Sequence, residues 1–91
     1  MAFELERPWA LDDRVALRPE PFGALAYHFG TRRLSFLKSR KLLDIVRGLG
    51  EHASGREACT AAGVSDAELP AYARALETLA ASGMIRERAA S

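Results

Sequence analysis

The stretch from Gly23 to Leu37, GALAYHFGTRRLSFL, constrains the fold most, because its pattern predicts a two-stranded hairpin. Gly30 and Thr31 suit a two-residue type II′ turn, in which glycine takes the first central position. The register that this turn sets puts Leu25, Tyr27, Leu34 and Phe36 on one face and Ala26, His28, Arg33 and Ser35 on the other. A slip of one residue would mix the two sets. The turn and the pattern therefore agree on a hairpin with Tyr27 opposite Leu34.

A further strand is predicted before the hairpin. Val15 and Leu17 alternate with polar or small residues over residues 14–18, which indicates a short strand. Pro19 and Pro21 are expected to end it, because proline has no N–H to donate to a sheet. The three strands together predict an antiparallel meander.

Three helices are predicted after the meander. Ser39 is a candidate N-cap for a first helix that ends near Leu49, and the capping-box pattern at Ser54 opens a second through Ala62. A second capping box at residues 65–68 opens the third and longest helix, which ends near Ser82, and Pro70 places its regular start within a turn. Residues 84–85 are expected to return to the core as a short strand.

This order predicts an α+β fold: a winged helix-turn-helix with an N-terminal three-stranded antiparallel sheet followed by three helices. The expected organisation is an N-terminal arm over residues 1–13, one domain over residues 14–86 and a flexible tail over residues 87–91.

Composition narrows the class of protein. The chain is 48% hydrophobic and 27% charged with a net charge of +1, as expected for one globular domain and not for a strongly basic nucleic-acid binder. Cys59 is the single cysteine, so an internal disulfide and a multi-thiolate metal site are excluded. The sequence has no membrane-length apolar run and no signal-peptide pattern, so a cytoplasmic protein is expected.

No catalytic or cofactor motif is present, and we expect no enzyme activity, metal or cofactor. His28 and His52 have no metal-ligand spacing around them and are interpreted as ordinary surface or hairpin residues. Glycine-rich phosphate loops and nucleophile elbows are absent from the sequence. At this size the absence favours a binding module.

Charge is unevenly distributed along the chain. Between Arg32 and Arg47 there are six basic residues and one acid, whereas residues 51–87 carry six acids and three arginines. The basic stretch would attract an anionic partner if it forms a surface patch, although a solvated face explains it equally well.

DNA binding is the alternative that a helix-turn-helix raises. A recognition helix carries Arg, Lys, Asn or Gln near its N-terminus, but the third helix begins with Asp66 and Glu68, which repel phosphate. Its outer face is a stripe of small residues: Ala71, Ala75, Thr78 and Ser82. Such a stripe reads no bases, but it lets another backbone approach closely.

The last strand of the meander offers a different site. If the strand over residues 33–37 is an open edge beside that stripe, the two form a groove for an extended peptide, bound by strand addition. Nearby basic residues such as Lys38 would favour an acidic peptide. The edge could instead be covered by the protein itself, or pair with a second copy in a self-associating structural subunit.

Three stretches carry a family resemblance: residues 9–11 (Trp-Ala-Leu), residues 14–27 and residues 34–37 (Leu-Ser-Phe-Leu). With strands followed by three helices, they resemble the PqqD-like family of peptide-recognition domains of ribosomally made, modified peptides. Within it the chain is most similar to the mycofactocin-system peptide chaperones, over about residues 9–85.

The resemblance implies a non-catalytic chaperone that binds the leader of a precursor peptide and presents it to a radical S-adenosylmethionine (SAM) maturase. The leader would add to the third strand and rest against the third helix, and the maturase would modify the C-terminal Val-Tyr of the precursor peptide. The implied peptide-binding residues are Arg33, Leu34, Ser35, Phe36, Leu37, Lys38, Ala71, Arg74, Ala75 and Thr78. Because a radical enzyme needs several cysteines for its cluster, the iron–sulfur chemistry is expected in the partner.

Overall fold

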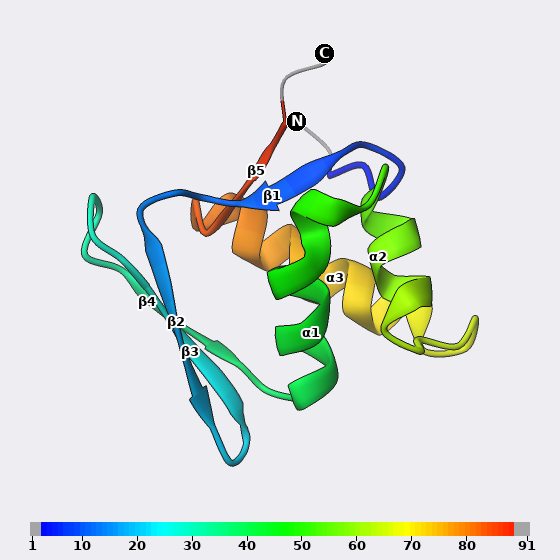
Figure 1. The fold of residues 1–91 in the computed structure, drawn as a ribbon, viewed down its shortest axis with the longest axis horizontal. Helices are drawn as coiled ribbons and strands as arrows, with labels where there is room; N and C mark the ends of the chain where they lie inside the picture. Colours follow the sequence, from blue (N-terminus) through cyan, green and yellow to red (C-terminus); the bar gives the residue numbers. More distant parts are fainter. Residues whose placement is uncertain (1–2, 89–91) are drawn as a thin grey trace.

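The computed structural model describes residues 3–88 and shows an α+β fold of antiparallel strands and three α-helices (Figure 1). Its strands are β1 (Trp9–Leu11), β2 (Val15–Glu20), β3 (Gly23–His28), β4 (Leu34–Leu37) and β5 (Ile85–Glu87). Its helices are α1 (Arg40–Gly48), α2 (Gly55–Ala61) and α3 (Leu69–Ala81), with a 3-10 turn η1 (Leu49–Glu51) after α1. Residues 1–2 of the predicted arm and 89–91 of the predicted tail lie outside the described residues. No helix between residues 3 and 88 is both long enough and apolar enough to span a membrane.

The meander forms as predicted, with the strand order β2-β3-β4 and the predicted pairs Tyr27–Leu34 and Leu25–Phe36. The predicted type II′ turn is wrong. Arg32 takes the left-handed conformation (φ 62°), and its N–H donates to the His28 carbonyl at 2.7 Å. The loop therefore has four residues, Phe29 to Arg32. A two-residue and a four-residue loop centred on the same peptide bond give the same pairing, which is why the register is right.

His28 explains the larger loop. Its Nδ1 accepts hydrogen bonds from the N–H groups of Gly30 and Thr31, both at 3.0 Å. The ring is only 2% exposed, so of the two interpretations given for this histidine, the hairpin position is confirmed and the surface position is wrong. Its Nε2 lies 3.6 Å from the Asp12 carboxylate. The imidazole thus accepts from two backbone N–H groups of the four-residue loop that would otherwise bond only to water.

The first strand extends further than predicted, since β2 continues through Pro19 to Glu20. The Phe29 N–H donates to the Arg14 carbonyl at 2.8 Å, and hydrogen-bonded and non-bonded pairs alternate along an antiparallel ladder. Pro19 opposite Ala24 therefore falls at a non-bonded pair, where the backbone nitrogen points away from β3. Proline costs the sheet no hydrogen bond at this position.

The two faces of the meander differ in their surroundings. Ala24 and Ala26 are 0% and 1% exposed and face α1, which can approach closely because these side chains are small. The opposite face is the more apolar one, yet it lies toward solvent. Its exposed members include Phe22 (45%), Phe29 (63%), Leu34 (52%) and Phe36 (58%).

A second sheet ties the two ends of the described chain together. β1 pairs antiparallel with β5, with Trp9 opposite Glu87 and Leu11 opposite Ile85. Figure 1 shows the two strands side by side across one end of the molecule. The short final strand is confirmed. The predicted arm therefore contains a strand, and Glu87, placed at the start of the predicted tail, ends β5.

The first two helices start at their predicted caps, whereas α3 starts after Glu68 and not at the predicted Ser65. The Ser39 hydroxyl accepts from the Leu42 N–H at 3.0 Å, and the Ser54 hydroxyl accepts from the Glu57 N–H at 3.1 Å. Ser65 and Glu68 form the reciprocal bonds of a capping box, at 3.0 and 3.3 Å. This box closes a turn before the regular part of α3, which starts at Leu69.

The core lies between the meander, β1–β5 and the helices. Its largest fully buried side chains include Leu37, Ile45, Leu49, Leu76 and Met84. Cys59 is also fully buried, and burial raises the pKa of its thiol. This thiol is a packing residue rather than a nucleophile.

Candidate functional site

The outer edge of β4 is open, because β3 is its sheet partner and the sheet ends there. The His28 N–H donates to the Arg33 carbonyl at 2.9 Å, which makes this a bonded pair. By alternation Ser35 and Leu37 also bond to β3, whereas the N–H and C=O groups of Leu34 and Phe36 point away from it. An added strand would find its hydrogen-bonding groups at these two residues.

The opposite edge of the same sheet is blunted. On β2 the outward-pointing backbone nitrogens belong to Val15, Leu17 and Pro19. The Val15 N–H is already used by the Asp12 carbonyl at 3.0 Å, and Pro19 has no N–H. Proline is one of the ordinary means by which proteins protect a sheet edge. Of the two edges of this sheet within residues 3–88, the β4 edge is the one whose outward N–H groups are neither replaced by proline nor already bonded to backbone.

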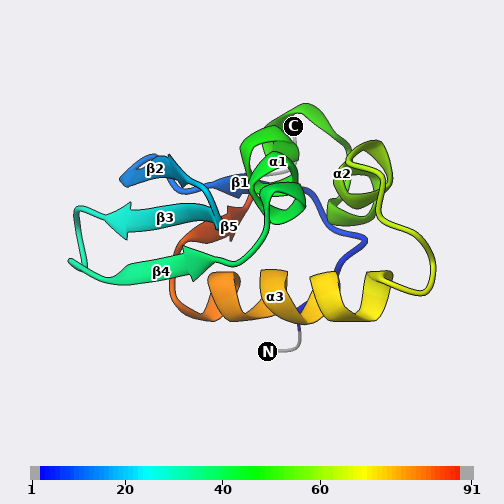
Figure 2. The ribbon, with the colours of Figure 1, turned by 90° about the horizontal axis from the view of Figure 1, so that it is seen from below.

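A groove runs between this open edge and α3. Figure 2 shows β4 as the strand of the meander that lies nearest to α3. Between them is a cavity of about 410 Å³, lined by Leu34, Ser35, Phe36, Lys38, Leu42, Ala75, Thr78 and Leu79. A second cavity of about 160 Å³ is lined by Lys38, Ser39, Leu42, Ala71, Tyr72 and Ala75. The two cavities adjoin, because they share Lys38, Leu42 and Ala75 as lining residues, and together they are called the β4–α3 groove.

The groove is apolar at its base and open at its rim. Leu42 and Leu79 are 7% and 4% exposed and give it an apolar floor. The small side chains Ala71 and Ala75 leave room above that floor. A strand laid along β4 can therefore approach α3 closely, with apolar side chains directed into the depression.

The basic residues do not gather into one patch. Lys38 lines the groove. Lys41 lies 3.3 Å from the Glu68 carboxylate, whose pKa is lowered first by the Ser65 N–H and then by this lysine. Arg40 and Arg47 line a separate cavity beside the β2–β3 turn. Two acidic residues, Glu20 and Asp44, line the same cavity. The charge available to a ligand in the groove comes from Lys38.

Seven of the residues expected to bind peptide line the groove: Leu34, Ser35, Phe36, Lys38, Ala71, Ala75 and Thr78. Arg33 and Arg74 are exposed and lie outside both cavities. Leu37 is 0% exposed, so its side chain belongs to the core. The floor residues Leu42 and Leu79 were missed, because their helical spacing marks them as core without showing that they border an opening.

The described residues thus form a small α+β domain in which the open β4 edge lies above an apolar groove, which is the geometry of a domain that can bind an extended segment. The chain belongs to the Peptide chaperone MftB family, whose model matches residues 8–86. The predicted resemblance to the mycofactocin-system peptide chaperones is therefore confirmed.

Curated relatives match over nearly the whole chain. The Peptide chaperone MftB of Mycobacterium ulcerans (strain Agy99) is 57% identical over 84 residues, which are 92% of this chain and 77% of that protein. The protein of the same name from Mycobacterium tuberculosis is 51% identical over 94% of this chain and 79% of its own length. The one from Mycolicibacterium smegmatis is 48% identical over 93% and 83%. No solved structure matches the chain.

Proposed function

We propose that this protein is a non-catalytic peptide chaperone of mycofactocin biosynthesis. It binds the leader of a ribosomally made precursor peptide by strand addition to β4, and presents the peptide to a radical SAM maturase in the cytoplasm. The observation that carries the proposal is the open β4 edge above the β4–α3 groove. The relatives' name, peptide chaperone, supports the same class of ligand.

Strand addition suits the geometry of this edge. Main-chain bonds to Leu34 and Phe36 supply affinity that does not depend on peptide sequence, and alternate side chains supply specificity. Side chains directed toward α3 meet Leu42 and Leu79 and should be apolar. Lys38 at the groove favours an acidic leader.

The maturase supplies the chemistry in this proposal. The single cysteine of the chain is fully buried, so a cysteine-bound iron–sulfur cluster belongs to the partner. The strands and helices act as a winged helix-turn-helix scaffold, with α3 serving as the wall of a peptide groove instead of a reader of DNA. The acidic Glu68 just before α3 weighs against phosphate binding there.

The test is a calorimetric titration with the precursor peptide, alone and with the radical SAM enzyme. We expect saturable one-to-one binding, tighter in the ternary mixture. Blocking variants Ala75→Arg and Thr78→Arg should lose at least tenfold in peptide affinity, and the second sits at an exposed site where folding is preserved. Ala61→Arg, at an exposed position of α2 outside the groove, is the matched control. Wild-type affinity in both groove variants would refute the site.

A further inference from the structure

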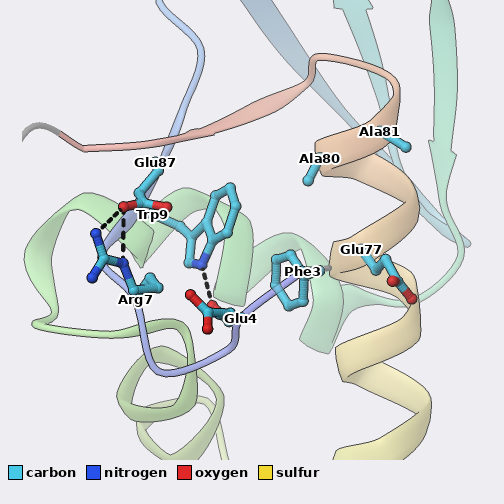
Figure 3. A pocket seen from close by; sticks show the side chains of 8 residues that line it. All are labelled: Phe3, Glu4, Arg7, Trp9, Glu77, Ala80, Ala81 and Glu87. Carbon is cyan, nitrogen blue, oxygen red and sulfur yellow. Dashed lines mark hydrogen bonds and ion pairs between the residues drawn. The ribbon is translucent and has the colours of Figure 1, made fainter. Parts of the chain in front are cut away.

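A further cavity, of about 680 Å³, lies between the N-terminal segment, β5 and α3. Figure 3 shows Phe3 and Trp9 of the N-terminal segment with Ala80 of α3 turned toward them, and Glu87 of β5 beside Arg7. Glu4, Glu77 and Ala81 complete the lining of the cavity. At 100° per residue, Glu77 and Ala81 lie about 160° and about 120° around the helix axis from Ala75, and no residue lines both this cavity and the groove. The cavity and the β4–α3 groove can therefore be occupied at the same time.

Two stacked aromatic rings form one wall of this cavity. The Phe3 and Trp9 rings lie 4.8 Å apart between centroids, with 27° between their planes. The Trp9 Nε1–H donates to the Glu4 carbonyl at 2.8 Å, which fixes the indole in place. The short side chains of Ala80 and Ala81 leave space opposite the rings. A rigid, partly buried indole is the preferred platform for a cation.

The lining has an excess of negative charge. Its three carboxylates, on Glu4, Glu77 and Glu87, face a single cation, Arg7. That cation is taken, since the Arg7 Nε donates to Glu87 at 2.9 Å. Glu4 and Glu77 form no ion pair with any described residue. Glu77 therefore lines the cavity from α3 without an ion pair among the described residues. Glu4 lines it from the N-terminal segment, where its negative charge helps, after the hydrogen bond to Glu87, to raise the pKa of Arg7.

We propose that this cavity receives an arginine side chain of a second protein that docks on the peptide-loaded chain. A guanidinium can stack on the indole while its N–H groups bind carboxylates in plane, which a compact ammonium does less well. The cavity exceeds a guanidinium in volume, so the arginine would enter together with part of the segment that carries it. Docking on the peptide-loaded chain rests on the proposed function, because a partner in this cavity leaves the residues of the β4–α3 groove to the peptide.

Binding in this cavity can be followed by the fluorescence of Trp9, because Trp9 is the only tryptophan of the sequence. The probe is N-acetyl-arginine amide, titrated against the full chain without peptide and followed by tryptophan fluorescence. N-acetyl-citrulline amide, the neutral isostere, is the matched control, and N-acetyl-lysine amide separates guanidinium from ammonium. We expect a saturable change with the arginine probe, weaker with lysine and absent with citrulline.

Two variants test the carboxylates. Glu4→Gln and Glu77→Gln should each weaken arginine binding by about two- to fivefold, as removal of a partly exposed ion pair does. Glu57→Gln, an exposed change on α2 outside the cavity, should leave binding unchanged. Equal curves for arginine and citrulline, or wild-type binding in the double variant, would overturn the site.

The source of the arginine is tested separately. If a second copy of this chain supplied it, sedimentation of the wild type would show a concentration-dependent mass that Glu77→Gln abolishes, and the assignment to another protein would be wrong. A constant monomer mass supports that assignment. These readouts need no precursor peptide, so failure here leaves the peptide proposal standing, and failure of peptide binding leaves this cavity's result intact.

Discussion

Replacing Phe36 with proline would test whether a peptide pairs with the β4 edge. The Phe36 N–H points away from β3, so proline removes a donor from the open edge and leaves the β3–β4 ladder complete. The sheet already contains a proline at its other edge, because the backbone nitrogen of Pro19 in β2 points away from β3. Ser35, the residue before the change, is in the extended conformation that a following proline requires.

The expected magnitude comes from one main-chain hydrogen bond. Such a bond contributes about 0.5–1.5 kcal/mol net, which corresponds to about two- to thirteenfold in dissociation constant. Both variants lose the Phe36 ring, whose centroid lies 6.1 Å from that of the Phe22 ring, but Phe36→Ala keeps the backbone N–H. The difference in peptide affinity between the two variants therefore reports the loss of the N–H alone. The assay is calorimetric titration of wild type, Phe36→Ala and Phe36→Pro with the precursor peptide, and denaturant unfolding of the same three proteins.

We expect Phe36→Pro to bind at least twofold more weakly than Phe36→Ala at similar stability. Ser35→Pro provides the reverse case, because its N–H belongs to the ladder and its loss should destabilise the fold. Equal peptide affinity of Phe36→Pro and Phe36→Ala, with both folded, would refute strand addition at this edge. NMR chemical-shift changes of the backbone amides on saturation with the precursor peptide provide a second measurement. They should be largest at Leu34 and Phe36 and smaller at Ser35.

Three further predictions concern charge, the hairpin loop and pH. The double variant Arg33→Glu and Lys38→Glu should slow peptide association mainly at low salt, and equal rates at every salt concentration would dismiss electrostatic attraction. His28→Ala should lower the free energy of unfolding by about 1–3 kcal/mol, because the N–H groups of Gly30 and Thr31 lose their shared acceptor; His52→Ala is the control, and equal losses in both would contradict this reading. The pKa of Asp12 is lowered from 3.8, first by the Arg14 N–H and then by the Arg14 side chain. Stability from this carboxylate is therefore complete above about pH 4 and lost as the pH falls through the lowered value, so Asp12→Asn should flatten the acid side of the stability profile, and an unchanged slope would contradict it.

Local chemistry made the helix starts and the hairpin register predictable. Ser39 and Ser54 are read as caps from a few neighbouring residues, and the structure confirms both. The turn type was not predictable in the same way, because it depends on the buried imidazole of His28. The end of β2 was misjudged for a related reason, since the cost of Pro19 depends on which side of the ladder its nitrogen faces.

In the candidate site, too, some features could be predicted from local sequence and others depend on tertiary packing. The small-residue stripe of α3 could be predicted from spacing, and Ala71, Ala75 and Thr78 do line the groove. The floor could not, because Leu42 lies on another helix and its contribution depends on tertiary packing. The pairing of β1 with β5 joins residues more than 70 positions apart, and no local sequence pattern predicts which strand β1 pairs with.

The unlike edges of the meander limit how copies of this protein can assemble. With Pro19 on β2, the sheet can grow from β4 only. Two copies could join edge to edge through β4, but the pair would then present only its two β2 edges, where Pro19 lacks an N–H, so further strand addition is opposed. Any such pair would also hide the β4 edge, and peptide and second copy would compete for it. A concentration-dependent dimer that dissociates on adding peptide would be the signature of that competition.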